Sequence, residues 1–227
     1  MDSIEPDELY DERGSVDLCR PLLQGDVFDD VLLPGFDEPM LVQIVNHPCA
    51  MRKGPELLPR ITVAPVRQHQ RVRGNGWNGN FTFMPLPELV AGAHFATHFA
   101  DVTAAPVKLL DVRKRVASLQ DRGIYVLQQR LVKHYTRIDA SISDLHEQSA
   151  PTLTEAELQV DWLHTVLSDD EQDNPAAIDA EVLQFDAWLG AGDPSSRTLL
   201  KQEYNFSDVR RAAHQAAITR RDTLHSS

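Results

Sequence analysis

The feature that most constrains the fold is a change of hydrophobic pattern after about residue 110. Residues 25–110 hold roughly five short strand-like runs, such as 40–45 and 61–66, which are rich in β-branched residues. Turn signals at Asn75-Gly76 and Asn78-Gly79 interrupt these runs. Beyond residue 118 the apolar residues recur at helical spacing. Short strands at this spacing followed by helices predict an α+β protein with a small antiparallel β-barrel.

The same pattern divides the chain into four segments. We expect an acidic, flexible N-terminal segment at 1–24 and a β-barrel with a packed helix at 25–140. A linker at 141–153 and an acidic helical region at 154–227 follow. Helix start and stop signals support the helical part, and they include Ser118, Thr154, Asn174-Pro175, Gly190 and Ser207.

Charge is partitioned along the chain in a way that matches this division. Residues 1–40 carry twelve acids and two bases, 41–140 carry six acids and fourteen bases, and 141–227 carry sixteen acids and six bases, within a total of −12. A basic middle between acidic flanks indicates one functional core, with flanks that shield it or face partners. The overall acidity argues against nucleic-acid binding by the whole surface, but an acidic chain can still carry a local basic site that binds nucleic acid.

The chain shows no sign of membrane insertion or export. It has no run of about 18 apolar residues, and its first fifteen residues are acidic and lack an apolar stretch. The two cysteines, Cys19 and Cys49, are therefore expected to be reduced thiols. We expect a cytoplasmic protein with no membrane partner.

A basic turn region forms the first candidate site. Cations that track phosphates beside rings that stack on bases are typical of RNA-binding or single-stranded DNA-binding surfaces. The nucleic-acid-binding candidates are Arg52, Lys53, Arg60, Arg67, Arg71, Arg73 and Trp77. A solvated basic face whose aromatic residues belong to the barrel core explains the same pattern.

Histidines and a cysteine offer a second, chemical site. His47, Cys49 and His69 are the catalytic candidates, as acid, base or nucleophile. His47 and Cys49 can also be combined with His94 and His98, four apart, into a zinc site. The simpler interpretation is that Cys49 is a small buried hydrophobe and His47 caps its loop. We expect no metal and no cofactor, and we assign Asp101 to solvation or capping.

The acidic helices carry wide apolar stripes that could bind a protein partner or a second copy of the chain. Trp162, Phe185 and Trp188 are the partner-binding candidates. The alternative is that these helices cover the barrel. The dense acidic run at 169–171, with Asp173, also raises the possibility of a nucleic-acid mimic.

Three short motifs resemble the PemK/MazF toxin family. They are Gly25-Asp26-Val27, then Glu38-Pro39-Met40-Leu41-Val42, then Val63-Ala64-Pro65-Val66, within residues 25–67. The resemblance implies an SH3-like barrel and, from the family, RNA cleavage. Two positions depart from the family pattern: Glu38 replaces the catalytic arginine before the proline, and Arg67 replaces the Ser or Thr after the Ala-Pro segment. A reversed charge at the first position removes a cation that stabilises phosphoryl-transfer charge.

These observations lead to three functional hypotheses. The first is a non-catalytic interaction or regulatory subunit of a bacterial defence or toxin–antitoxin-like system. The second is an endoribonuclease with a rearranged site, in which Arg67, Arg71 and Arg73 hold phosphate and His47 or His69 acts as acid or base. The third is an acidic nucleic-acid mimic that inhibits a host or phage enzyme. The departures from the family pattern favour the non-catalytic reading.

Overall fold

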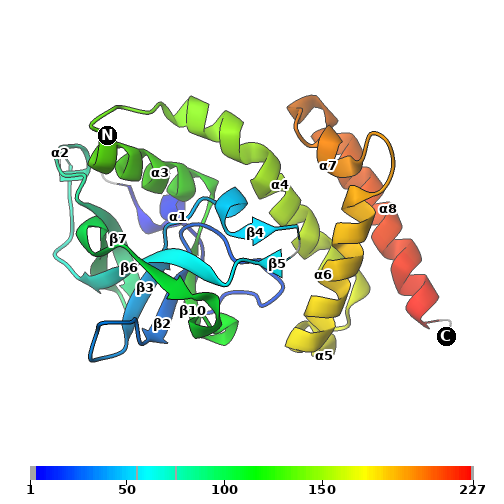
Figure 1. The fold of residues 1–227 in the computed structure, drawn as a ribbon, viewed down its shortest axis with the longest axis horizontal. Helices are drawn as coiled ribbons and strands as arrows, with labels where there is room; N and C mark the ends of the chain where they lie inside the picture. Colours follow the sequence, from blue (N-terminus) through cyan, green and yellow to red (C-terminus); the bar gives the residue numbers. More distant parts are fainter. Residues whose placement is uncertain (1–3, 55, 75, 226–227) are drawn as a thin grey trace. The chain divides into compact units, whose positions relative to one another are not determined.

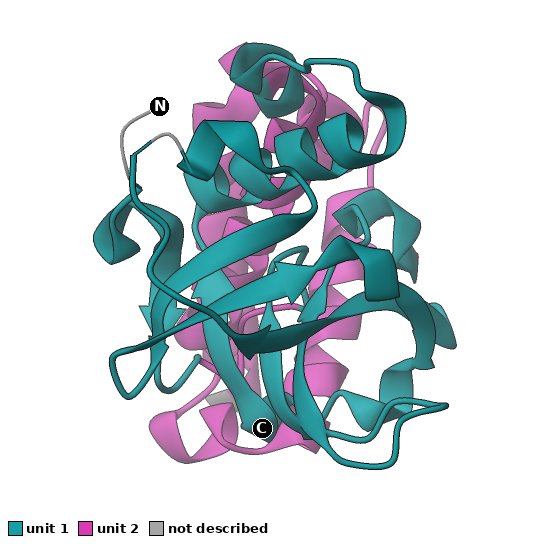
Figure 2. Ribbon diagram, turned by 90° about the vertical axis from the view of Figure 1, so that its left-hand side faces the viewer, with its two compact units in different colours: residues 1–16, 22–52, 57–146 teal, residues 17–21, 53–56, 147–227 magenta. Residues whose placement is uncertain are grey.

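The computed structural model describes residues 4–54, 56–74 and 76–225 (Figure 1). These residues divide into two compact units (Figure 2). Unit 1 takes the described residues within 1–16, 22–52 and 57–146. Unit 2 takes those within 17–21, 53–56 and 147–227. Asn75, one half of an expected turn signal, lies outside the described residues.

Unit 1 is built on an antiparallel sheet that curves into a nearly closed barrel, so the expected α+β barrel fold is confirmed. Its strands are β1 (Tyr10–Arg13), β2 (Val27–Val31), β3 (Met40–Ile44), β6 (Arg60–Gln68), β7 (Phe83–Val90), β8 (Ala93–His98), β9 (Thr103–Pro106) and β10 (Arg115–Leu119). Their order within the described residues is β1-β10-β2-β3-β6-β8-β7, and β9 pairs with β6. The β-branched runs become the central strands β3 and β6, whose residues Val42, Ile44 and Val63 are buried.

Short elements and one long helix complete unit 1. The short elements are α1 (Pro6–Leu9), α2 (Gly76–Gly79), the 3₁₀ turns η1 (Pro48–Ala50), η2 (Phe99–Asp101), η3 (Val107–Leu109) and η4 (Val112–Lys114), and the hairpin strands β4 (Arg52–Lys53) and β5 (Glu56–Leu57). The strands β4 and β5 each have one residue in unit 1 and one in unit 2. The long helix α3 (Asp121–Thr136) buries Ile124 and Leu127 and begins within two residues of the expected start at 119.

The N-terminal segment differs from the expected flexible tail. Residues of β1 pair with β10 at the edge of the sheet, and Leu9, the last residue of α1, is buried. The close packing of α1 on α3 requires a glycine at Gly123, because a Cβ there would lie 2.4 Å from the Leu9 carbonyl oxygen. The apolar residues of this segment are irregularly spaced, so the hydrophobic periodicity of the sequence does not predict their burial.

A buried ion pair joins Arg115, the first residue of β10, to Asp26, the residue just before β2. Asp26 accepts hydrogen bonds from Arg115 at 2.9 Å, from the Leu23 N–H at 3.0 Å and from the Ser118 hydroxyl. Gly25, beside it, has a φ of +96°, and a Cβ there would overlap the side chain of Leu119. The Gly-Asp pair that resembles the toxin family therefore has a structural role in this chain.

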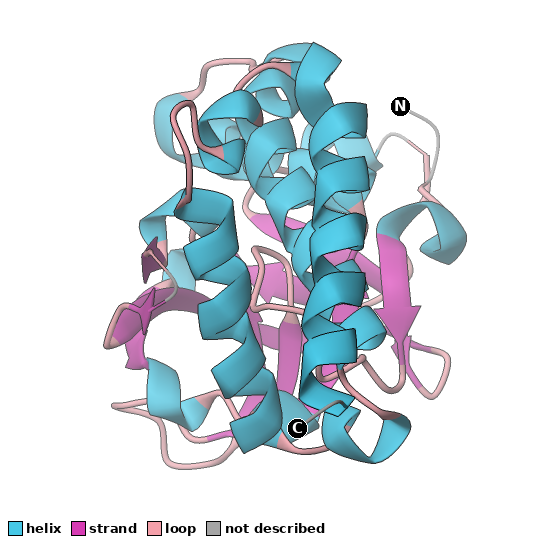
Figure 3. Ribbon diagram, turned by 90° about the vertical axis from the view of Figure 1, so that its right-hand side faces the viewer, coloured by secondary structure: helices cyan, strands magenta, loops and turns pink. Residues whose placement is uncertain are grey.

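Unit 2 is helical (Figure 3). Its elements are the larger part of α4 (Ile142–Val166), then α5 (Asp169–Gln172), α6 (Pro175–Gly190), α7 (Ser196–Leu199), η5 (Glu203–Asn205) and α8 (Phe206–His225). The expected boundaries of α6 are confirmed. The expected linker at 141–153 is instead helical from residue 142, even though Pro151 removes one backbone donor. No helix among the described residues is long and apolar enough to cross a membrane.

Candidate functional site

The best-formed cluster of reactive side chains lies at one end of β6 and β8 in unit 1. Arg67 of β6 stands opposite Ala96 of β8, and Phe83 of β7 stands opposite His98. His69 continues the ladder beyond β6 through a 2.9 Å hydrogen bond from its N–H to the His94 carbonyl. Because side chains two residues apart share a face of a sheet, this register puts Arg67, His69 and His98 on the same face.

The two imidazoles lie close together on that face. The ring centres of His69 and His98 are 6.4 Å apart, and the ring of Phe83 packs against both, at 4.7 and 6.1 Å. The sheet therefore places two possible acid–base groups within reach of one small ligand.

An exposed ion pair borders the two rings. Arg67 contacts Asp101 of η2 at 2.8 Å, with the side chains 50% and 37% exposed. Burial, together with the nearby Arg67 and His69, lowers the pKa of the His98 imidazole, and Asp101 acts in the opposite direction. His98 is thereby favoured as a neutral base at neutral pH.

The tautomer of the second imidazole is set by its neighbour. His69 Nδ1 lies 2.7 Å from the Gln70 carbonyl oxygen, which can only accept a hydrogen bond, so Nδ1 carries the proton. In the neutral ring Nε2 is then the nitrogen that can exchange a proton with a ligand.

The remaining basic candidates separate into two groups. Arg71 and Arg73 follow His69 in the chain and are exposed, and Arg71 pairs with Glu5 at 3.2 Å. Arg60 begins β6 and donates to the Ala104 carbonyl at 2.7 Å. With about 3.3 Å per residue, Arg60 and Arg67 lie roughly 23 Å apart along the strand. Arg52 and Lys53 form the separate strand β4.

His47 and Cys49 belong to the Arg60 end of the barrel. The preceding Asn46 and Val45 pair with Thr62 near the start of β6. His47 caps η1 by accepting the Cys49 N–H at 3.3 Å, as the simpler interpretation expected. Cys49 is exposed, which corrects its expected burial. The structure thus does not bring His47 or Cys49 to His69.

The zinc site drawn from His47, Cys49, His94 and His98 is not assembled among the described residues. No three of these side chains bring their ligand atoms close enough together to hold one metal ion. His94 instead accepts the Glu88 N–H at 3.1 Å.

The expected stacking ring at Trp77 is part of the interior. Trp77 is 2% exposed, so its faces are not available to a base. Arg130 of α3 donates to the carbonyls of Trp77 at 2.6 Å, Phe83 at 2.8 Å and Asn80, and its guanidinium lies 5.3 Å from the Phe81 ring. Burial lowers the pKa of Arg130 to about 10, which leaves it charged at neutral pH. This cation holds the 77–83 segment in place. The position of Trp77 agrees better with aromatic residues in the barrel core than with rings that stack on bases.

Tyr135 has an exposed aromatic ring near the candidate site, and the sequence analysis did not name it as a candidate. It is 61% exposed on α3, and its hydroxyl donates to the Phe99 carbonyl at 3.2 Å, next to His98. Its position could not be read from the sequence, because α3 and η2 are far apart along the chain. Asp101 was similarly assigned to solvation, and only the fold reveals its contact with Arg67.

The partner-binding candidates form the core of unit 2. Trp162, Phe185 and Trp188 pack against one another with ring centres 5.7 to 6.0 Å apart. Trp162 and Phe185 are buried, so they are not available as a docking surface. In the acidic run, Glu171 caps α5 by accepting from the Ser168 N–H at 2.9 Å, which gives that residue a local role.

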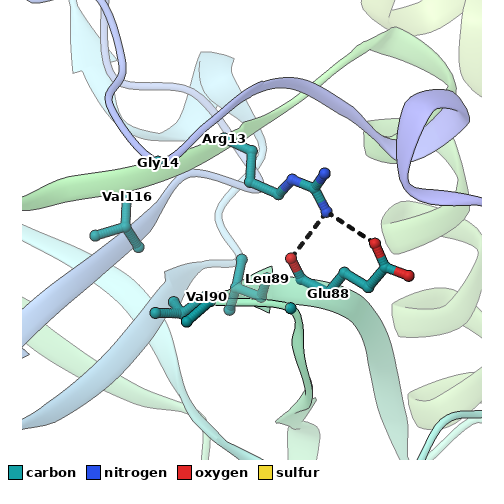
Figure 4. Close-up of a pocket in the computed structure, with 8 residues that line it drawn as sticks. Arg13, Gly14, Glu88, Leu89, Val90 and Val116 are labelled. Carbon is teal, nitrogen blue, oxygen red and sulfur yellow. Dashed lines mark hydrogen bonds and ion pairs between the residues drawn. The ribbon is translucent and has the colours of Figure 1, made fainter.

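A pocket of about 330 Å³ lies in unit 1 where β1 faces β7 (Figure 4). Arg13 crosses this seam to the Glu88 carbonyl at 2.8 Å and to its carboxylate at 3.7 Å. The rest of the lining consists of Gly14, Leu89, Val90, Ala91, Gly92 and Val116. None of the candidate site residues lines it, so we assign the seam to barrel closure.

Comparisons with known proteins do not assign this chain. No family model matches it, and no curated protein matches its sequence.

Proposed function

We propose that unit 1 binds single-stranded RNA on the face that carries Arg67, His69 and His98, and cleaves it by general acid–base catalysis. The observation that supports this proposal is the pair of imidazoles, 6.4 Å apart, beside an exposed guanidinium on one sheet face. Cleavage by the RNA's own 2′-hydroxyl needs a base, an acid and a cation. These three residues provide one group for each role.

The lowered pKa of His98 favours it as the base. It takes the proton from the 2′-hydroxyl, and the 2′-oxygen forms a bond to phosphorus. The bond from phosphorus to the 5′-oxygen breaks, and protonated His69 gives its Nε2 proton to that oxygen. Arg67 exchanges Asp101 for the phosphate and stabilises the developing charge. The products are a 2′,3′-cyclic phosphate and a 5′-hydroxyl.

Cleavage of end-labelled single-stranded RNA tests the proposal. We expect His98→Ala and His69→Ala each to lower the cleavage rate by about 10²- to 10⁴-fold, the usual contribution of a general acid or base. His47→Ala is the matched control, because His47 belongs to the other end of β6, and it should keep the wild-type rate. An RNA with a 2′-deoxy group at the scissile nucleotide should bind and stay intact.

Two outcomes would overturn this assignment. A wild-type chain that cleaves none of a broad panel of RNAs has no such activity. Cleavage that persists unchanged in both His69→Ala and His98→Ala belongs to another site or to a contaminant.

One observation favours a non-catalytic function as the second candidate. Arg67 and Arg71 are both paired with carboxylates, Asp101 and Glu5, which lowers the positive potential available to RNA. Under this proposal the chain is an interaction or regulatory subunit in a bacterial defence or toxin–antitoxin-like system. A stoichiometric protein partner recovered from the native host, with no RNA bound or cleaved, would favour it.

A further inference from the structure

A second cluster of reactive side chains lies in unit 2 and shares no residue with the proposed RNA site. Asp17 and Cys19 come from the short segment 17–21, and His164 comes from α4. One ligand atom from each residue, a carboxylate oxygen, the Sγ and an imidazole nitrogen, lies within 4.8 Å of the other two. His164 Nε2 is 2.6 Å from Asp17 Oδ2.

We propose that Asp17, Cys19 and His164 bind a zinc ion, with water as the fourth ligand. Thiolate, imidazole and carboxylate are the three ligand types that zinc takes in proteins. Zinc–ligand bonds of about 2.0–2.3 Å in a tetrahedron put the ligand atoms roughly 3.3–3.7 Å apart. Small side-chain rotations reach this spacing: the contact between His164 and Asp17 opens slightly, and Sγ moves toward both.

The backbone of segment 17–21 preorganises two of the three ligands. Asp17 Oδ1 accepts the Cys19 N–H at 2.9 Å, and the Asp17 carbonyl accepts the Arg20 N–H at 3.2 Å. This tight turn holds the carboxylate beside the thiol, so only His164 must come from another element.

The burial of the three residues fits a metal site that opens to solvent on one side. Cys19 is 1% exposed within the apolar core of unit 2, whereas the His164 and Asp17 side chains are 43% and 28% exposed. An ion can enter from the His164 side and keep a water molecule there, as open zinc sites do. The buried thiol is out of reach of a substrate, which argues against a nucleophilic role. A further carboxylate, Asp173, lies within electrostatic range of Cys19.

Zinc at this position would join segment 17–21 to α4 and stabilise unit 2. Binding to the folded chain alone raises its stability in proportion to the logarithm of the metal concentration. No sequence motif predicts a metal site here, since His164 is far along the chain from Asp17 and Cys19.

Cobalt(II) titration of the full chain tests the proposal, since cobalt replaces zinc in such sites and reports on its ligands. We expect a thiolate-to-cobalt charge-transfer band that saturates at one ion per chain and disappears when zinc is added. His164→Gln and Asp17→Asn alter exposed or half-buried side chains, so folding should survive. Each should weaken binding more than about 10-fold, because even outer-shell changes cost 10- to 100-fold.

The two cysteines provide the matched control. Cys49→Ser should keep the charge-transfer band, because Cys49 belongs to η1 in unit 1. Cys19→Ser should abolish it, with circular dichroism used to confirm that the variant is folded. No thiolate band in the wild type, or an unchanged band in His164→Gln, would overturn the proposal and leave the trio as a hydrogen-bonded cluster.

Discussion

Two arginine–aspartate pairs of nearly equal length lie in the barrel unit, and they differ in their access to water. The Arg115–Asp26 pair is 2.9 Å long with neither side chain exposed, while the Arg67–Asp101 pair is 2.8 Å long and 50% and 37% exposed. The Asp26 carboxylate also accepts hydrogen bonds from the Leu23 N–H and the Ser118 hydroxyl. Removing one member of the Arg115–Asp26 pair would leave the charge of the other buried. An exposed pair contributes about 1 kcal/mol at most. The buried pair therefore holds the strands together, and the exposed pair can be exchanged for a ligand.

The largest expected effect is on stability. Asp26→Ala should lower the free energy of unfolding by about 3–5 kcal/mol, because it removes the carboxylate of a fully buried ion pair. Asp101→Ala is the matched control and should cost less than about 1 kcal/mol. Urea unfolding followed by circular dichroism measures both values. Equal losses for the two variants would contradict the contrast between the pairs.

The next largest effect concerns the exposed end of the barrel. Tyr135→Ala should weaken the binding of single-stranded RNA by about 1–3 kcal/mol if the ring next to η2 stacks on a base. Tyr204→Ala, which removes an exposed ring of unit 2, is the control and should bind as the wild type does. Fluorescence anisotropy with a non-cleavable RNA measures the affinities. A Tyr135→Ala affinity equal to the wild type would remove the stacking role.

A smaller effect should follow from releasing the exposed arginine. Asp101→Asn keeps the shape of the side chain but removes its charge. The RNA phosphate then no longer competes with a carboxylate for Arg67. We expect RNA to bind up to about 5-fold more tightly, which corresponds to about 1 kcal/mol. The same change at Asp111, which is held by Arg113 on η4, should leave the affinity unchanged. Weaker binding by Asp101→Asn would mean that Asp101 supports the site.

The smallest effects are opposite shifts in the pKa of His98. Arg67→Gln removes a nearby cation and should raise this pKa, whereas Asp101→Asn should lower it further. Imidazole proton chemical shifts measured against pH test both directions, and pKa shifts of the same sign in the two variants would contradict the assignment.

His98 has a folded pKa below its ordinary value of 6.5, so the unfolded chain binds the proton more readily. Its contribution to stability is therefore complete above that value and is lost as the pH falls through the folded pKa.

Local patterns in the sequence predicted much of the fold, because they reflect local physics. The β-branched runs became β3 and β6, and the cap at Asn174 with the glycine at Gly190 bounded α6. The N-terminal segment was the main difference, since its burial depends on pairing with β10, about a hundred residues later in the chain. Such long-range pairing leaves no periodic signal in the segment itself.

The candidate site was predicted only in part, because it depends on strand register. Arg67 and His69 were named from the sequence, and β6 does place them together. His98 was considered only as a metal ligand, and its approach to His69 follows from the pairing of β6 with β8. Trp77 and Trp162 were binding candidates with a buried position as the alternative, and both rings are buried, since a large ring in an apolar pattern is more often core than surface.

The most direct test of the exposed site is an NMR titration of the histidine rings with a non-cleavable single-stranded RNA. The account predicts that the imidazole signals of His69 and His98 shift together and saturate at one RNA per chain. The signals of His47, at the other end of β6, should stay in place. Shifts at His47 alone, or no shift at His69 and His98 at a saturating RNA concentration, would contradict the account.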